Sequence, residues 1–144
     1  MSQKKVLFRL EKDDDGYPPA DVEGVWCVQL PDDGFVVDNI PFFARQVALG
    51  DVVSVEQASG ELFYTSILQR STNSLLRVVL FGNHDPSHLR SELAKLGCAT
   101  EQSHLQSLIA VNIPSKVKIG RVRQVLDEGC SQGLWDYEET VLRQ

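Results

Sequence analysis

Hydrophobic and polar residues alternate in short runs along the first half of the chain, as they do in β-strands. Residues 5–11 place Val6, Phe8 and Leu10 on one side of an extended chain, because successive side chains of a strand point to opposite faces. Further runs follow, separated by turns rich in Gly, Pro, Asp or Asn: residues 22–30, 35–37, 52–56 and 62–69. We expect a curled antiparallel β unit resembling a small barrel, because closure removes unpaired strand edges.

From about residue 74 the pattern changes to strands that alternate with amphipathic helices. An apolar run at 75–81 reads as a buried strand, and a helix is expected to follow it. Asp85 is a good N-cap for this helix, Pro86 suits its first position, and Gly97 suits its C-terminal cap. The apolar face between them carries leucines at helical spacing: Leu89, Leu93 and Leu96.

A second helix is expected between Ser115, as its cap, and Gly129, as its terminator. Strands are expected before and after it, at residues 98–104, 105–113 and 134–141. The resulting β-α-β-β-α-β order is the ferredoxin-like arrangement. The predicted fold class is α+β: an acidic, β-rich subdomain at 1–73 packed on a ferredoxin-like subdomain at 74–144.

The negative charge of the chain belongs to its first half. Residues 1–73 contain 12 acidic and 6 basic residues, a net charge of −6, whereas residues 74–144 contain 8 of each, a net charge of zero. Much of the acidity lies in turns: Asp13, Asp14, Asp15, Asp32, Asp33 and Asp38. Such a field attracts basic partners and repels nucleic acid and anionic membranes.

Bulk composition indicates a cytoplasmic globular protein. Apolar residues make up 42% of the chain, which supports a sizeable core, but no apolar run approaches the roughly 20 residues of a membrane helix. The N-terminus lacks the apolar segment of a signal peptide. Cys27, Cys98 and Cys130 are odd in number and widely spaced, so we expect free thiols, with Cys27 and Cys98 as inert core residues.

Two patterns resemble metal sites, and neither predicts one. Residues 13–16 are acidic like a calcium loop but lack alternate acidic spacing, and Val22 stands where the loop would need Glu. His84 and His88 lie at an expected loop-to-helix boundary rather than on two turns of one helix. Solvated side chains are the expected state of both groups, and we predict no metal and no cofactor.

No catalytic motif accompanies the acidic field. The sequence contains no nucleophile elbow, P-loop, dinucleotide fingerprint or HExxH pattern. Asp38 and Asp51 could form a carboxylate pair, but both stand at strand-turn junctions where Asp commonly caps. We predict no catalytic residues and no enzymatic activity.

Basic residues gather in the second expected helix: Lys116, Lys118, Arg121 and Arg123. Ferredoxin-like domains often bind RNA through exposed aromatic side chains of the sheet. The expected strands here show no aromatic platform with flanking basic residues, and the net charge opposes RNA. A solvated helix face is the favoured interpretation, and an RNA-associated regulator is the third functional hypothesis.

Three sequence elements resemble those of a bacterial family classified as a domain of unknown function. They are a DGYPP element at 15–19, a DNIPFFA element at 38–44 and an ALGDVV element at 48–53. Some small acidic proteins of this sort resemble immunity proteins encoded beside polymorphic antibacterial toxins. The resemblance thus implies a cytosolic immunity or antitoxin-type protein that occludes the active site of a basic toxin domain, either an ADP-ribosyltransferase or a nuclease.

The expected partner surface combines the acidic turns with neighbouring aromatic and polar residues. Its members are Asp13, Asp14, Asp15, Tyr17, Asp32, Asp33, Asp38, Asn39, Phe42, Phe43 and Arg45. Exposed charge contacts contribute little individually, so an aromatic anchor is expected among them. The alternative is a small-ligand protein or enzyme that uses a cleft between the two halves, with Asp38, Arg45 and Asp51 nearby.

Overall fold

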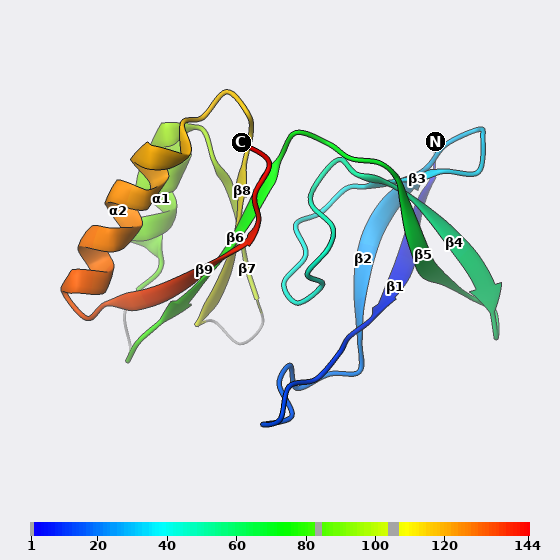
Figure 1. The fold of residues 1–144 in the computed structure, drawn as a ribbon, viewed down its shortest axis with the longest axis horizontal. Coiled ribbons are helices and arrows are strands. Elements are labelled where there is room, and N and C mark those ends of the chain that lie inside the picture. Colours follow the sequence, from blue (N-terminus) through cyan, green and yellow to red (C-terminus); the bar gives the residue numbers. More distant parts are fainter. Residues whose placement is uncertain (1, 83–84, 104–106) are drawn as a thin grey trace. The chain divides into compact units, whose positions relative to one another are not determined.

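The computed structural model describes residues 2–82, 85–103 and 107–144, and it confirms the predicted α+β class. The chain divides into two compact units, Met1–Ser71 and Thr72–Gln144. The first unit is a closed β-barrel, and the second is an antiparallel sheet with two helices in its described part (Figure 1).

The barrel is a meander in which each strand pairs with the next one along the chain. Its strands are β1 (Gln3–Arg9), β2 (Val22–Gln29), β3 (Phe35–Val37), β4 (Val52–Ala58) and β5 (Glu61–Gln69). Consecutive strands are antiparallel, and β5 returns to pair with β1 in parallel, with Val6 opposite Leu62. This parallel pair closes the sheet and removes its edges.

Alternation along the strands builds the barrel core as the sequence predicted. Val6 and Phe8 of β1 are buried together with Val25 and Cys27 of β2, two residues apart in each strand. The ring of Phe8 stacks on that of Tyr64 with 4.7 Å between centroids. Residues of the opposite parity face outward, and Trp26 keeps 45% of its surface exposed.

The second unit has the ferredoxin-like order and strand arrangement. Its elements are β6 (Ser74–Leu80), α1 (Ser87–Leu96), β7 (Ala99–Gln102), β8 (Leu108–Ile113), α2 (Ile119–Ser131) and β9 (Trp135–Val141). The strands lie in the order β7-β8-β6-β9, all antiparallel. Leu89 of α1 and Leu126 of α2 share one core with Val78 and Ile109 of the sheet, so both helices cover the same face (Figure 1).

Helix α1 ends as predicted, but it begins one residue later, at Ser87, with Pro86 at the N-cap. The Asp85 carboxylate accepts the backbone N–H of Ser87 at 2.9 Å, which caps the first turn. Gly97 has φ of 104°, and the N–H groups of Gly97 and Cys98 return to the carbonyls of Ala94 and Leu93. This is a Schellman ending, which requires the left-handed conformation that glycine adopts without strain.

The predicted limits of the second helix were wrong at both ends. Helix α2 begins at Ile119 rather than beside Ser115, and it continues through Gly129 to Ser131. The terminator is Gly133, with φ of 74°, and the next residue, Leu134, donates its N–H to the Gly129 carbonyl. Gly129 serves packing instead: a Cβ atom there would lie 1.9 Å from the Trp135 ring. A tertiary contact therefore explains the glycine that looked like a terminator.

Candidate functional site

The connection between β3 and β4 contains the DNIPFFA element, and the carboxylate of one residue binds its backbone. Glu23 of β2 accepts the backbone N–H groups of Phe42, Phe43 and Ala44 at 2.6, 2.9 and 2.8 Å. Three N–H donors on one carboxylate form a strong, charge-assisted arrangement. The loop therefore presents its aromatic side chains from a fixed backbone.

Asp51 and Asn39 of this connection also bind backbone N–H groups. Asp51 is fully buried and accepts the N–H groups of Ala48 and Ser71 at 3.0 and 2.8 Å. Asn39 accepts the N–H of Trp26 at 2.6 Å, and Asp38 accepts a hydrogen bond from the Gln3 side chain. Asp51 is thus a structural carboxylate that joins the end of this connection to the segment after β5.

The β1–β2 connection, residues 10–21, is organised by Asp13. Its carboxylate accepts the N–H groups of Asp15 and Tyr17, both at 2.9 Å, and its own N–H returns to the Tyr17 carbonyl. Gly16, with φ of 78°, makes the turn between them. The Tyr17 ring then meets Phe43 edge-on, with 5.9 Å between centroids. The DGYPP and DNIPFFA elements, far apart in sequence, are therefore in contact.

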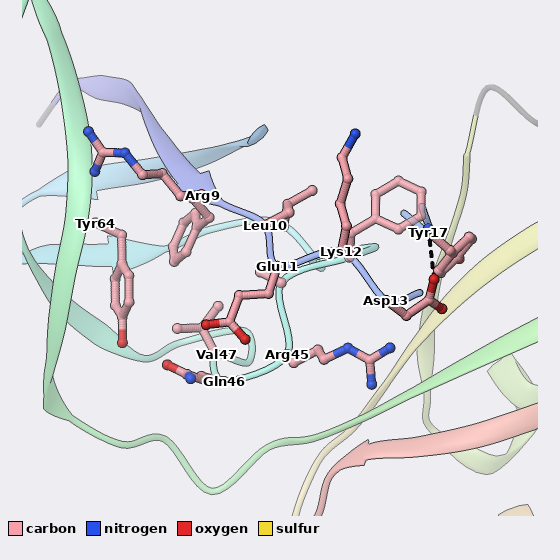
Figure 2. Close-up of a pocket in the computed structure, with 13 residues that line it drawn as sticks. Arg9, Leu10, Glu11, Lys12, Asp13, Tyr17, Arg45, Gln46, Val47 and Tyr64 are labelled. Atoms are coloured by element: carbon pink, nitrogen blue, oxygen red, sulfur yellow. Dashed lines mark hydrogen bonds between the residues drawn. The ribbon is translucent and has the colours of Figure 1, made fainter. Parts of the chain in front are cut away.

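A pocket of about 430 Å³ opens beside this contact. Figure 2 shows Asp13 and Tyr17 at one side of it and Tyr64 at the other. Phe8, Leu10, Phe43, Ala44 and Val47 contribute apolar surface to its lining. Its remaining lining residues are polar or charged: Arg9, Glu11, Lys12, Asp13, Tyr17, Arg45, Gln46 and Tyr64. An apolar floor with a charged rim is suited to binding an apolar group that carries charged neighbours.

Charges at the rim are of both signs, and some are already paired. Lys12 forms an ion pair with Asp21 at 3.1 Å, and the Arg9 guanidinium stacks on the Phe63 ring at 4.1 Å. Glu11 and Arg45 are exposed side chains at the rim. Burial and the nearby Asp51 carboxylate raise the pKa of Tyr64 at the pocket wall, opposed by Arg70, so Tyr64 is a neutral hydroxyl at physiological pH.

The structure separates the predicted partner residues into groups. Asp13, Tyr17, Phe43 and Arg45 line the pocket, with Asp14 and Asp15 in the same loop. We call residues 10–17 and 43–47 the pocket end of the barrel. Asp32 and Asp33 belong to the β2–β3 turn, at the opposite end of β2 (Figure 1), and the 8 residues of that strand span about 25 Å. Asp38 and Asn39 lie beside Trp26, and Phe42 follows in the same loop.

The sequence interpretation missed Glu23, the residue that binds the backbone of the DNIPFFA element. It has the same parity in β2 as the buried Val25 and Cys27, so its side chain lies on the face that should be apolar. A carboxylate at such a position requires hydrogen-bond donors. This pattern was readable in the sequence, although the identity of the donors was not.

Thiols and candidate metal ligands give no further site among residues 2–82, 85–103 and 107–144. These residues contain no cluster of three or more His, Cys, Asp or Glu side chains that could hold a metal ion. Burial, with a smaller effect of Asp38, raises the pKa of the Cys27 thiol to about 12, and burial raises that of Cys98 to about 11. Both are unreactive thiols at neutral pH. His84, one of the two histidines considered as a metal pair in the sequence, and His104 lie outside the described residues.

The comparison with known families decides what this chain is. The family described as a domain of unknown function (DUF4265) matches residues 23–137. The chain belongs to the DUF4265 family. The matched range contains the elements at 38–44 and 48–53 and begins after the DGYPP element at 15–19.

A crystal structure of a hypothetical protein from Neisseria gonorrhoeae is similar to this member of the DUF4265 family. The TM-score is 0.84, with 22% sequence identity, and the match covers 100% of this chain and 98% of that one. At this identity the likeness shows a shared fold. A search of curated proteins found no match. No helix in the described part of the chain is long and apolar enough to cross a membrane.

Proposed function

We propose that this protein is a cytoplasmic, immunity-type inhibitor that neutralises a basic toxin domain by covering its active site. The pocket end of the barrel is the contact surface in this proposal. One observation carries it: the densest acidic cluster of the chain, Asp13–Asp15, lies in the same loop that lines the pocket. The protein acts stoichiometrically in this proposal, without catalysis.

Interfaces of this kind combine an anchor with a charged rim. Most of the binding free energy comes from a few residues that fill desolvated pockets, and rim charges act mainly on association rate. The pocket here would receive an apolar side chain of the toxin, while Glu11, Asp14 and Asp15 face basic residues around it. A nuclease or an ADP-ribosyltransferase fits this description, because each binds a polyanionic or nucleotide substrate through basic groups.

The experiment compares two charge reversals that are equal in size, one at the pocket end of the barrel and one outside the pocket lining. Asp14→Lys with Asp15→Lys alters the pocket end and leaves the structural carboxylate of Asp13 in place. Asp32→Lys with Glu61→Lys alters two exposed positions outside the pocket lining, one in the β2–β3 turn and one just after the β4–β5 turn, and is called the turn-end variant. Each double variant changes the net charge by +4, so whole-molecule electrostatics are matched.

Each protein is co-expressed with the gene directly beside its own, which the proposal expects to encode a toxin domain. Wild type and the turn-end variant should restore growth, and the pocket-end variant should not. With the purified toxin domain, the pocket-end variant should associate about tenfold more slowly at low salt, with a weaker salt dependence. The proposal is wrong if the neighbouring gene encodes no toxin that wild type neutralises, or if both variants protect equally.

A small-ligand function is the second candidate, and the pocket volume supports it. About 430 Å³ lies within the range of small-molecule sites. This pocket lies wholly within the barrel unit, whereas the sequence alternative placed its cleft between the two halves. Replacing Ala44 by Phe in the pocket wall distinguishes the candidates. A small-ligand protein would lose ligand-induced stabilisation, whereas an inhibitor would lose toxin protection.

A further inference from the structure

The second unit contains a separate pocket that the proposed function does not use. It has a volume of about 480 Å³ and is lined by residues of α1, α2 and the beginning of β9. Leu89, Val125, Leu134 and Trp135 provide its apolar surface. This volume is also within the range of small-molecule sites.

A glycine within α2 makes room for the aromatic wall of this pocket. The Trp135 indole lies against Gly129, where a Cβ atom would come within 1.9–2.5 Å of three ring atoms. The indole Nε1–H donates to the Leu126 carbonyl at 2.9 Å, which fixes the ring plane. Gly129 and Trp135 both line the pocket, so its aromatic wall is rigid rather than formed by a mobile side chain.

In the described part of the chain, the carboxylates of the pocket lining stand without a Lys or Arg, and the other polar lining residues are His88 and Gln132. Asp85, Glu92 and Glu128 contribute carboxylates, and no Lys or Arg belongs to the lining among the described residues. This contrasts with the unit as a whole, whose basic and acidic residues are equal in number. Asp85 also accepts the backbone N–H of Ser87 in the first turn of α1. The Glu92 carboxylate forms an ion pair with the Lys95 ammonium group, with 3.4 Å between Oε1 and Nζ. Glu128, on α2, is an exposed carboxylate.

We propose that this pocket binds a small organic cation with an apolar body, such as an alkylammonium or arylammonium ion. The apolar body would lie against Trp135 and Val125, and the ammonium group would lie between the carboxylates of Glu92 and Glu128. An ammonium ion is attracted by carboxylates, and its apolar body gains free energy by contact with apolar side chains. The inference is independent of the proposed toxin partner, which would bind the other unit.

The test uses three probes that share an aromatic body and differ in charge. They are 2-phenylethylammonium, 2-phenylethanol and 3-phenylpropionate. Binding to the full-length Trp26→Phe variant is followed by the NMR signal of the indole N–H, because Trp135 is then the only tryptophan. We expect saturable binding of the ammonium probe, weaker binding of the alcohol and none of the carboxylate. Equal shifts from all three probes, or no saturable shift below roughly 10 mM, would refute a cation site.

Three variants in the same background locate the binding. Glu128→Gln, which removes one rim charge, should weaken ammonium binding about two- to fivefold. Val125→Phe should fill the pocket and abolish binding. Glu56→Gln removes an exposed charge of the barrel unit and should leave affinity unchanged. If Val125→Phe perturbs folding by circular dichroism, the Glu128→Gln result decides. Unchanged affinity in Glu128→Gln, or an equal loss in Glu56→Gln, would contradict the proposal.

Discussion

Each of the two units has its own apolar core, but polar side chains have a larger part in fixing the connections of the barrel. In the barrel, polar side chains bind the backbone of the long connections: Glu23, Asn39 and Asp51 hold the β3–β4 connection, and Asp13 holds the β1–β2 loop. In the second unit, two helices cover one face of a sheet through apolar contacts. Its connections are closed by glycines, at Gly97 and Gly133.

This difference changes how the charge of the chain is interpreted. The barrel carries a net charge of −6 over residues 1–73, but its acidic residues do not form one class. Glu23, Asp51 and Asp13 accept backbone hydrogen bonds and would cost stability if removed. Asp14, Asp15 and Asp32 are exposed, and these are among the carboxylates available to a partner. Net charge identifies an acidic unit, whereas only hydrogen bonding separates structural acids from candidate contact residues.

The largest expected effect concerns close packing in the second unit. Gly129→Ala places a methyl group inside the Trp135 ring, so the helix or the indole must move. Overpacking of this kind costs about 3 kcal/mol. The matched control is Gly120→Ala in the same helix, where a Cβ atom meets nothing within 4 Å. It should raise the free energy of unfolding by about 0.5 kcal/mol.

Urea unfolding followed by Trp135 fluorescence in a Trp26→Phe background measures both glycine variants. Opposite signs for the two substitutions are expected. A destabilisation of Gly129→Ala no greater than that of Gly120→Ala would mean that the indole can move at little cost. The stability of the second unit would then depend less on close packing of its helices against the sheet than we infer from its apolar core.

The second effect concerns the carboxylate that holds the DNIPFFA element. Glu23→Ala leaves the N–H groups of Phe42, Phe43 and Ala44 without their acceptor, at a cost of about 2 kcal/mol. Glu23→Gln keeps one oxygen and should recover part of this. Amide hydrogen exchange at residues 42–44 should accelerate in both. Glu56→Ala, at an exposed position of β4, should change exchange and stability little. Unchanged exchange in Glu23→Ala would show that apolar contacts alone hold the loop.

The fold was predictable because local and tertiary preferences agree in most elements. Period-2 alternation placed Val6 and Phe8 in the barrel core, and the Asp85–Pro86 start and Gly97 end of α1 follow from capping chemistry that acts over a few residues. The C-terminal limit of the second helix was predicted wrongly because a packing contact with a residue beyond the helix explains its glycine. Glycine is typical of helix C-termini, but Gly129 lies inside α2 because only a residue without a side chain leaves room for the Trp135 ring. Such a close approach has no local signal.

The candidate site was less predictable for a related reason. A sequence shows which residues stand in turns, but the end of the barrel at which each turn lies depends on the strand order. Asp13 and Asp32 look alike in sequence, yet only Asp13 lies beside the pocket, because β2 carries the two turns to opposite ends. Tyr64 and Phe8 reach the pocket from strands whose pairing closes the barrel.

The smallest expected effect concerns an ion pair between a helix and the sheet of the second unit. The Arg123 guanidinium on α2 donates to both carboxylate oxygens of Glu139 on the edge strand β9, at 2.6 and 2.7 Å. These hydrogen bonds lower the pKa of Glu139 from its ordinary value of 4.5, despite an opposing effect of burial. The folded state therefore binds this proton less readily than the unfolded chain does. The contribution of the pair to stability is complete above about pH 4.5 and is lost as the pH falls through the lowered pKa of the folded state.

Glu139→Gln should therefore lower the melting temperature slightly at pH 7, by about 2 °C or less, because the pair is partly exposed to solvent. The difference from wild type should shrink as the pH falls below 4.5 and disappear once Glu139 is protonated in both states. Glu56→Gln, at an exposed position of the barrel, provides the control and should show no such convergence. A difference that stays constant from pH 7 to pH 3 would mean that Glu139 contributes through packing of its side chain. The edge strand β9 would then be held on α2 by packing contacts, as the other strands of the unit are held by their apolar side chains.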